Sequence, residues 1–134
     1  MKPNKQIIVT SVLLALTTPV LANEVVTELL QDYRSQAVQP FSAEAGRQLW
    51  IKFFTDANGD KRSCTTCHTS DPKQAGQHAR TGKRIEPLAP SVKPERLTQE
   101  RKVHKWLTRN CKWTLGRECN AQEKGYLLTY LNSL

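Results

Sequence analysis

The sequence lacks a long apolar run. Only 38% of its 134 residues are hydrophobic and 7% are aromatic. Its clearest apolar stretch, Ile7 to Leu16, is shorter than the ~20 residues that span a bilayer. The chain also has no convincing stretch of the alternating apolar and polar residues that is typical of half-buried strands. These absences argue against a membrane-spanning helix and predict an all-α domain.

The apolar stretch belongs to a predicted signal peptide, residues 1–22. Two lysines precede the stretch, and Val20-Leu21-Ala22 is a small-residue cleavage site. Cleavage there leaves residues 23–134 as one exported, periplasmic domain that no longer spans a membrane. An uncleaved anchor is the alternative.

One motif predicts the cofactor. In a C-x-x-C-H run, two thiols attach a haem covalently and the following imidazole ligates the iron. The run Cys64-Thr65-Thr66-Cys67-His68 occurs once, which predicts one haem c attached through Cys64 and Cys67, with His68 as an iron ligand. The alternatives are a chance match, half of a zinc site and a thioredoxin-like redox pair. The redox pair is disfavoured because it needs a βαβ pattern, which is not visible.

Methionine is absent once the signal peptide is removed. Met1 is the only methionine in the chain, whereas many small c-type cytochromes use a methionine thioether as the sixth iron ligand. The sixth position must therefore hold a histidine, lysine, asparagine or similar group, or be open.

Charge is unevenly distributed. Residues 23–68 carry five basic and six acidic groups, whereas residues 69–134 carry thirteen basic and six acidic groups. A basic second half around a haem predicts docking to an acidic partner or an anionic surface. Nucleic acid is a poor alternative, because an exported haem protein rarely meets it.

Four amphipathic helices are predicted from apolar residues at helical spacing. Ser42 and Thr98 are expected to cap the second and third helices, and Asn120 with Glu123 forms a capping box for the fourth. We expect the fourth helix to pack on the second, with Gly125 near the contact. The predicted apolar stripes are Val26, Leu29, Leu30 and Tyr33; Gly46, Leu49, Trp50 and Phe53; Val103, Trp106, Leu107 and Asn110; and Leu127, Tyr130, Leu131 and Leu134.

Asn110 lies on the apolar side of the third predicted helix, whereas His104 is at the edge of its stripe. Asn110 is therefore better placed to face the iron than His104. A helix C-cap is an equal alternative for Asn110, because asparagine tolerates the left-handed conformation.

Two cysteines, Cys111 and Cys119, remain after haem attachment. In an oxidising compartment only one disulfide can pair them, directly after Asn110. A zinc site completed by His104 or His78 is the minor alternative.

Several segments together resemble the sphaeroides haem protein family from about Gly46 onward. They are the C-x-x-C-H run, Arg80-Thr81-Gly82-Lys83 through Pro87-Leu88-Ala89-Pro90-Ser91, Lys105-Trp106-Leu107 with Arg109-Asn110-Cys111, and Gly116-Arg117-Glu118-Cys119.

The resemblance implies a class I cytochrome c-like fold with His68 as proximal ligand, Asn110 as ferric sixth ligand and a Cys111–Cys119 disulfide. It also implies that the asparagine leaves on reduction, that the ferrous haem then binds oxygen or nitric oxide, and that a dihaem c-type cytochrome donates the electron. A neutral amide oxygen suits ferric iron and binds the softer ferrous ion weakly, which agrees with this role.

The alternative function is a simple electron carrier with two histidine ligands, His68 with His104 or His78. Catalytic turnover is a third class, but no distal acid–base group is required by the sequence to face the iron. We therefore expect electron transfer and gas binding rather than a dedicated enzyme.

Overall fold

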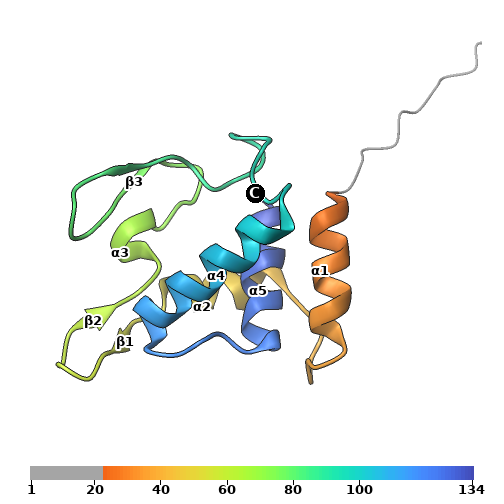
Figure 1. The fold of residues 1–134 in the computed structure, drawn as a ribbon, viewed down its shortest axis with the longest axis horizontal. Coiled ribbons are helices and arrows are strands. Elements are labelled where there is room, and N and C mark those ends of the chain that lie inside the picture. Colours follow the sequence, from red (N-terminus) through yellow and green to blue (C-terminus); the bar gives the residue numbers. More distant parts are fainter. Residues whose placement is uncertain (1–22) are drawn as a thin grey trace, which may run out of the picture.

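The computed structural model describes residues 23–134, so the predicted signal peptide lies outside the described residues. Five helices and two very short hairpins make up this part of the chain (Figure 1). The helices are α1 Glu24–Arg34, α2 Ala43–Ile51, α3 Thr65–His68, α4 Glu100–Leu115 and α5 Ala121–Asn132. Strand β1, Phe54–Thr55, pairs antiparallel with β2, Lys61–Arg62, and β3, Gly76–Gln77, pairs antiparallel with β4, Arg84–Ile85.

The predicted all-α class is confirmed, because no strand among residues 23–134 exceeds two residues. The strands themselves were not predicted, since a two-residue pairing leaves no readable alternation. The β1–β2 connection is a turn through Asn58-Gly59, where Gly59 has φ +88°. None of the described helices is long and apolar enough to cross a bilayer.

The helix caps mostly follow the sequence. The Ser42 side chain accepts a 3.0 Å hydrogen bond from the Ala45 amide at the start of α2. Asn120 and Glu123 form the predicted capping box of α5. The predicted Thr98 cap is wrong, because α4 begins one residue later, after Gln99, and the Thr98 hydroxyl instead donates to the Glu95 carbonyl oxygen at 2.8 Å.

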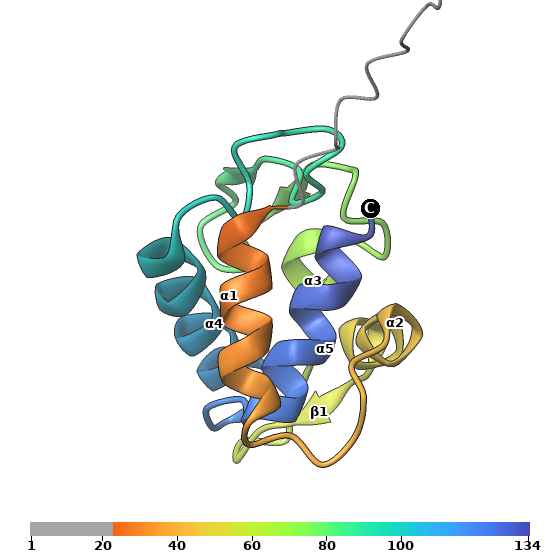
Figure 2. The same cartoon turned by 90° about the vertical axis from the view of Figure 1, so that its right-hand side faces the viewer.

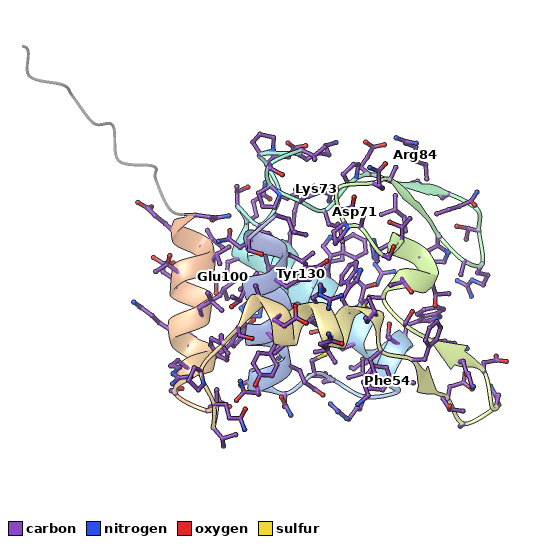
Figure 3. The ribbon with its side chains drawn as sticks, turned by 180° about the vertical axis from the view of Figure 1, so that it is seen from behind. Phe54, Asp71, Lys73, Arg84, Glu100 and Tyr130 are labelled. Atoms are coloured by element: carbon purple, nitrogen blue, oxygen red, sulfur yellow. A yellow bond between two sulfur atoms is a disulfide. The ribbon has the colours of Figure 1, made fainter. Side chains whose placement is uncertain are left out.

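Helix α5 lies between α1 and α2 in the centre of the domain (Figure 2). The predicted packing of α5 on α2 is confirmed, and it depends on Gly46, where a β-carbon would overlap the Tyr126 carbonyl oxygen. Tyr130 lies at the same contact (Figure 3). Gly125 instead faces the ring of Phe41, which precedes α2.

Two adjoining clusters form the core. The first joins Val26, Leu29 and Tyr33 of α1, as predicted, to Val103 and Leu128. The second contains Trp50, Cys111, Cys119, Leu127, Tyr130 and Leu131. Phe53 was predicted to be inward-facing, but α2 ends at Ile51 and the Phe53 side chain is 60% exposed.

The buried face of α4 differs from the predicted stripe. Its buried residues are Val103, Cys111 and Thr114, whereas Trp106 is 49% exposed and Asn110 is exposed. Cys111 is bonded to Cys119 within the core, and this bond turns the adjoining face of the helix inward. Trp106 and Asn110 therefore flank the buried face instead of forming it.

Candidate functional site

Helix α3 brings Cys64, Cys67 and His68 together. Cys64 precedes the helix, and its carbonyl oxygen accepts a 3.0 Å hydrogen bond from the His68 amide, so the helical turn begins at the first cysteine and ends at the histidine. Both thiols are free and partly buried. Burial raises the pKa of the Cys64 thiol to about 12, so the sulfur is protonated at neutral pH.

The imidazole of His68 is neutral at physiological pH. Burial, and after it the positive charge of Arg96, lower the pKa of His68 to about 4. A neutral imidazole keeps a free lone pair on one nitrogen, which is the form that ligates a metal. The histidine is therefore in the state required of an iron ligand.

Two aromatic contacts hold the chain beside His68. The Trp50 ring of α2 lies 5.5 Å from the His68 ring, measured between centroids, and 6.1 Å from the Tyr130 ring. The Trp50 indole N–H donates a 3.0 Å hydrogen bond to the carbonyl oxygen of Thr69. Thr69 has φ +62°, a backbone region that threonine rarely adopts.

The irregular segment after α3 wraps back over it. Gly76 of β3 is so close to α3 that a β-carbon there would overlap the Cys67 carbonyl oxygen. The amide of Ala79 lies 3.4 Å from the Cys67 sulfur. The segment thus covers the second cysteine with backbone rather than with side chains.

Arg96 fixes the later part of this segment. Its Nε donates to the Pro87 carbonyl oxygen at 2.7 Å, and its terminal nitrogen donates to the Glu86 carbonyl oxygen at 3.0 Å. These two hydrogen bonds hold the backbone of residues 86 and 87 against the Arg96 side chain.

A surface pocket of about 380 Å³ has lining residues from both α3 and α4, but Cys64, Cys67, His68 and Asn110 are not among them. Thr66, between the two cysteines, lines it from α3, and Trp113 lines it from α4. Trp113 follows Asn110 by about one helical turn, and Cys64 packs against the core cluster that contains Cys111. The remaining lining residues are Asp60, Lys61, Arg62, Ala79 and Arg80.

Asn110 is in the middle of a continuous helix. Helix α4 extends to Leu115 and is capped by Gly116 with φ +75°, so the C-cap alternative for Asn110 is wrong. Among residues 23–134, no hydrogen bond or ion pair joins Asn110 to His68, and Asn110 is exposed. The cysteine after Asn110 forms the predicted Cys111–Cys119 disulfide, which excludes the zinc alternative for these two sulfurs.

The two other histidines have partners of their own. His104 lies on the α1 side of α4, with Nδ1 3.5 Å from the Tyr33 hydroxyl and Nε2 3.4 Å from Glu100. Glu100, which contacts His104, and Arg84, in the hairpin that contains His78, lie at opposite sides of the domain (Figure 3). Nδ1 of His78 accepts hydrogen bonds from the backbone amides of Arg80 and Thr81.

Sequence reasoning missed four residues that shape the site: Trp50, Thr69, Gly76 and Arg96. Trp50 was recognised only as a core residue, and its polar contact depends on a turn that cannot be read from spacing. A glycine within an irregular segment is the one signal that could have indicated Gly76.

The geometry fits a covalently attached haem. Two free thiols and a neutral imidazole occupy one helical turn, and a pocket beside this turn is shared with α4. The exposed carboxamide of Asn110 lies on α4, between Trp106 and Trp113 in the sequence.

Comparisons with known proteins point in the same direction. A family model described as a domain of unknown function (DUF1924) matches residues 36–131. The cytochrome c-type protein SHP of Cereibacter sphaeroides is 45% identical over 117 residues, which cover 87% of this chain and 90% of that protein. Cytochrome c'' of Methylophilus methylotrophus is 36% identical over 86 residues, covering 64% of this chain and 60% of that protein.

Solved structures of the same two proteins are similar to this fold. The structure of oxidised SHP, described as an oxygen-binding cytochrome c, has a TM-score of 0.75 at 45% identity and covers 81% of this chain and 96% of its own. The crystal structure of oxidised cytochrome c'' from Methylophilus methylotrophus has a TM-score of 0.74 at 30% identity, and the match covers 83% of this chain and 95% of that chain. The helical fold inferred from the sequence is therefore that of these cytochromes.

Proposed function

This chain belongs to the family of the cytochrome c-type protein SHP, and from that premise we propose that it is an exported monohaem cytochrome c that accepts an electron and binds a diatomic gas. The observation that carries the proposal is helix α3, where two free thiols adjoin a neutral, half-buried imidazole. The related SHP is described as oxygen-binding, which supports oxygen as one ligand; nitric oxide is the second expected ligand.

Three residues of α3 hold the cofactor in this proposal. Cys64 and Cys67 attach haem c through their sulfurs, and His68 is the proximal ligand. The haem supplies an iron that changes oxidation state and coordinates small molecules. The polypeptide supplies the orientation: Trp50 packs beside the His68 ring, and the Thr69 carbonyl oxygen is held by the indole N–H.

Asn110 is the proposed sixth ligand in the ferric protein. Its amide oxygen is a neutral, hard donor that binds ferric iron better than ferrous iron. We expect the side chain to dissociate on reduction and leave a position for a gas. The absence of methionine after Met1 supports this assignment because it removes the commonest alternative ligand.

The structure favours this proposal over two histidine ligands. His104 interacts with Tyr33 and Glu100 on the α1 side of the domain. The Nδ1 atom of His78 is occupied by two backbone amides. Either histidine would have to change its surroundings to serve as a second ligand beside His68.

The remaining parts of the proposal concern where the protein works. Residues 1–22 direct export and are removed, and residues 23–134 form the single periplasmic domain. A dihaem c-type cytochrome is the expected electron donor. The basic second half of the chain supports an acidic partner.

The optical spectrum of the dithionite-reduced holoprotein, with and without carbon monoxide, tests the proposal. We expect a five-coordinate ferrous spectrum that changes to a six-coordinate spectrum when carbon monoxide is added. A ferrous spectrum that is already six-coordinate and does not respond to the gas would contradict gas binding. Failure to find thioether-linked haem would contradict the proposal as a whole.

A further inference from the structure

Helix α4 carries a strongly basic face. With about 100° of rotation per residue, its five cations fall within an arc of about 100°. The buried Val103, Cys111 and Thr114 lie on the opposite side of the helix. The basic face of α4 consists of Arg101, Lys102, Lys105, Arg109 and Lys112, all exposed.

The charge of this face is largely uncompensated within the domain. Glu100 is the only acidic residue of α4, and its carboxylate contacts His104. Lys112 pairs with Glu118 at 3.0 Å. In residues 23–134, the other four cations form no salt bridge: Arg101, Lys102, Lys105 and Arg109.

The spacing of these cations destabilises α4 taken on its own. Arg101, Lys105 and Arg109 follow one another at intervals of four residues, and like charges at this spacing repel. Replacing one of them with glutamate would convert that repulsion into an attractive pair. A face that keeps one sign of charge despite this cost is typical of a surface that meets an oppositely charged partner.

Trp106 borders the basic face of α4. The cations of Lys105 and Arg109 lie 5.8 and 5.1 Å from the Trp106 ring centroid. By the same rotation Asn110 lies about 80° beyond Lys102, outside the basic face, with Trp106 between the two. A protein bound to this face therefore also meets Trp106, which is 49% exposed.

We propose that the basic face of α4 docks the acidic surface of a soluble redox protein that donates electrons to this cytochrome. The partner is oxidised by one electron, the haem iron is reduced by one, and no atom is transferred. The proposal rests on the proposed function for electron acceptance, but it does not depend on gas binding. Charge complementarity identifies the partner because four adjacent cations lack an internal counter-charge.

Stopped-flow reduction of the ferric holoprotein tests the proposal with a surrogate donor. The donor is a reduced plant-type [2Fe–2S] ferredoxin, an acidic one-electron carrier, used at low ionic strength. The test variant is Arg101→Gln with Lys105→Gln, and the matched control is Arg47→Gln on α2 with Lys52→Gln at the C-cap of that helix. Both variants lose two positive charges, and α2 lies on the other side of α5 from α4 (Figure 2).

We expect the α4 variant to be reduced roughly tenfold more slowly than the unaltered protein, and the difference to vanish at high salt. The α2 variant should remain within about twofold of the unaltered protein, as expected for net charge alone. Equal slowing of both variants, or slowing of neither, would overturn the proposal.

Three further measurements keep the result interpretable. Reduction by hexaammineruthenium(II), a cation, should not be slowed in the α4 variant, and its melting temperature should be unchanged or slightly higher because like-charge repulsion is relieved. If the α4 variant melts well below the unaltered protein, the single Lys102→Gln variant replaces it in the kinetic test. This variant should also be reduced by ferredoxin more slowly than the unaltered protein. Sedimentation with phosphatidylglycerol vesicles tests whether the basic face of α4 binds an anionic membrane instead of a protein. The docking proposal would be overturned if the α4 variant lost vesicle binding while its reduction by ferredoxin was unchanged.

Dithionite reduction with carbon monoxide separates this proposal from the proposed function. Normal gas binding with no effect of the α4 charges would contradict only the docking surface. Absence of gas binding would contradict only the gas-binding function.

Discussion

The indole N–H of Trp50 donates a 3.0 Å hydrogen bond to the carbonyl oxygen of Thr69, the residue that follows His68. Trp50 is only 4% exposed, and its ring lies beside the His68 ring. Thr69 has φ +62°, and a non-glycine residue in such a conformation costs of order 1–3 kcal/mol. The hydrogen bond thus stabilises an unfavourable turn directly after the proposed proximal ligand.

Replacing Trp50 with phenylalanine should remove this hydrogen bond and retain an aromatic ring. We expect a loss of about 1–2 kcal/mol in the free energy of unfolding, because the Thr69 carbonyl loses its indole donor. Resonance Raman spectroscopy of the reduced protein should show a shifted or broadened iron–histidine band. The control is Tyr130→Phe, in the same cluster, which leaves the Thr69 hydrogen bond intact; equal shifts in both variants would contradict a specific role for the indole N–H.

Replacing Gly76 with alanine should impair haem attachment. The added β-carbon overlaps the Cys67 carbonyl oxygen, so either β3 or the helical turn of α3 must move. The ratio of haem absorbance to protein absorbance in the purified protein should fall several-fold. Gln74→Ala, at a nearby exposed position, is the control and should leave this ratio unchanged; a normal ratio in the Gly76 variant would show that the contact is not needed.

Replacing Asn110 with valine should change the ferric optical and electron paramagnetic resonance spectra. Valine offers no donor atom, so the proposed sixth ligand is lost while the side chain stays compact. His104→Gln is the control: it removes the alternative ligand and should leave both spectra unaltered. The opposite pattern, with an effect of His104 alone, would support ligation by two histidines.

Replacing both Cys111 and Cys119 with serine should destabilise the fold. The bridge joins residues eight positions apart, and closing so short a loop contributes about 2.5 kcal/mol in the chain-entropy model. Urea unfolding measures the loss. Because Asn110 adjoins Cys111, the ferric spectrum should also become heterogeneous, and an unchanged spectrum would show that the bridge does not help to hold the asparagine.

Stability should fall on acidification through the α5 cap. Hydrogen bonds from the Arg117 guanidinium, opposed in part by burial, lower the pKa of Glu123. The unfolded carboxyl has the higher pKa, so the cap contributes its full stabilisation above that value and loses it as pH falls through the lower folded pKa. The melting temperature should fall less between pH 7 and pH 3 in Glu123→Gln than in the unaltered protein. In Glu28→Gln, at an exposed position of α1, it should fall as much as in the unaltered protein.

Periodicity predicted the helices well where one face is buried against another helix. Val26, Leu29 and Tyr33 of α1 are buried as expected, and the Asn120–Glu123 capping box is formed because its signal is local. The prediction that Phe53 faces inward was wrong because α2 ends before this residue, and the end of a helix depends on the chain that follows.

The face of α4 could not be predicted from apolar residues alone. Two stripes were available, one through Trp106 and Asn110 and one through Cys111 and Thr114, and both have helical spacing. The disulfide decides between them, since it buries Cys111 beside Cys119. The C-x-x-C-H cysteines and histidine were recognisable because the motif is contiguous. The contacts of Trp50 and Arg96 were not, since they link positions that are distant or irregular in sequence.

The packing of Gly46 against α5 also links the spacing of these two helices to the candidate site. A β-carbon at position 46 would overlap the Tyr126 carbonyl oxygen, so even an alanine there would force α2 and α5 apart. Trp50 of α2 contacts both the Tyr130 ring of α5 and the His68 ring. A methyl group added on the far side of the helix pair would therefore displace the indole that lies against the proposed proximal ligand.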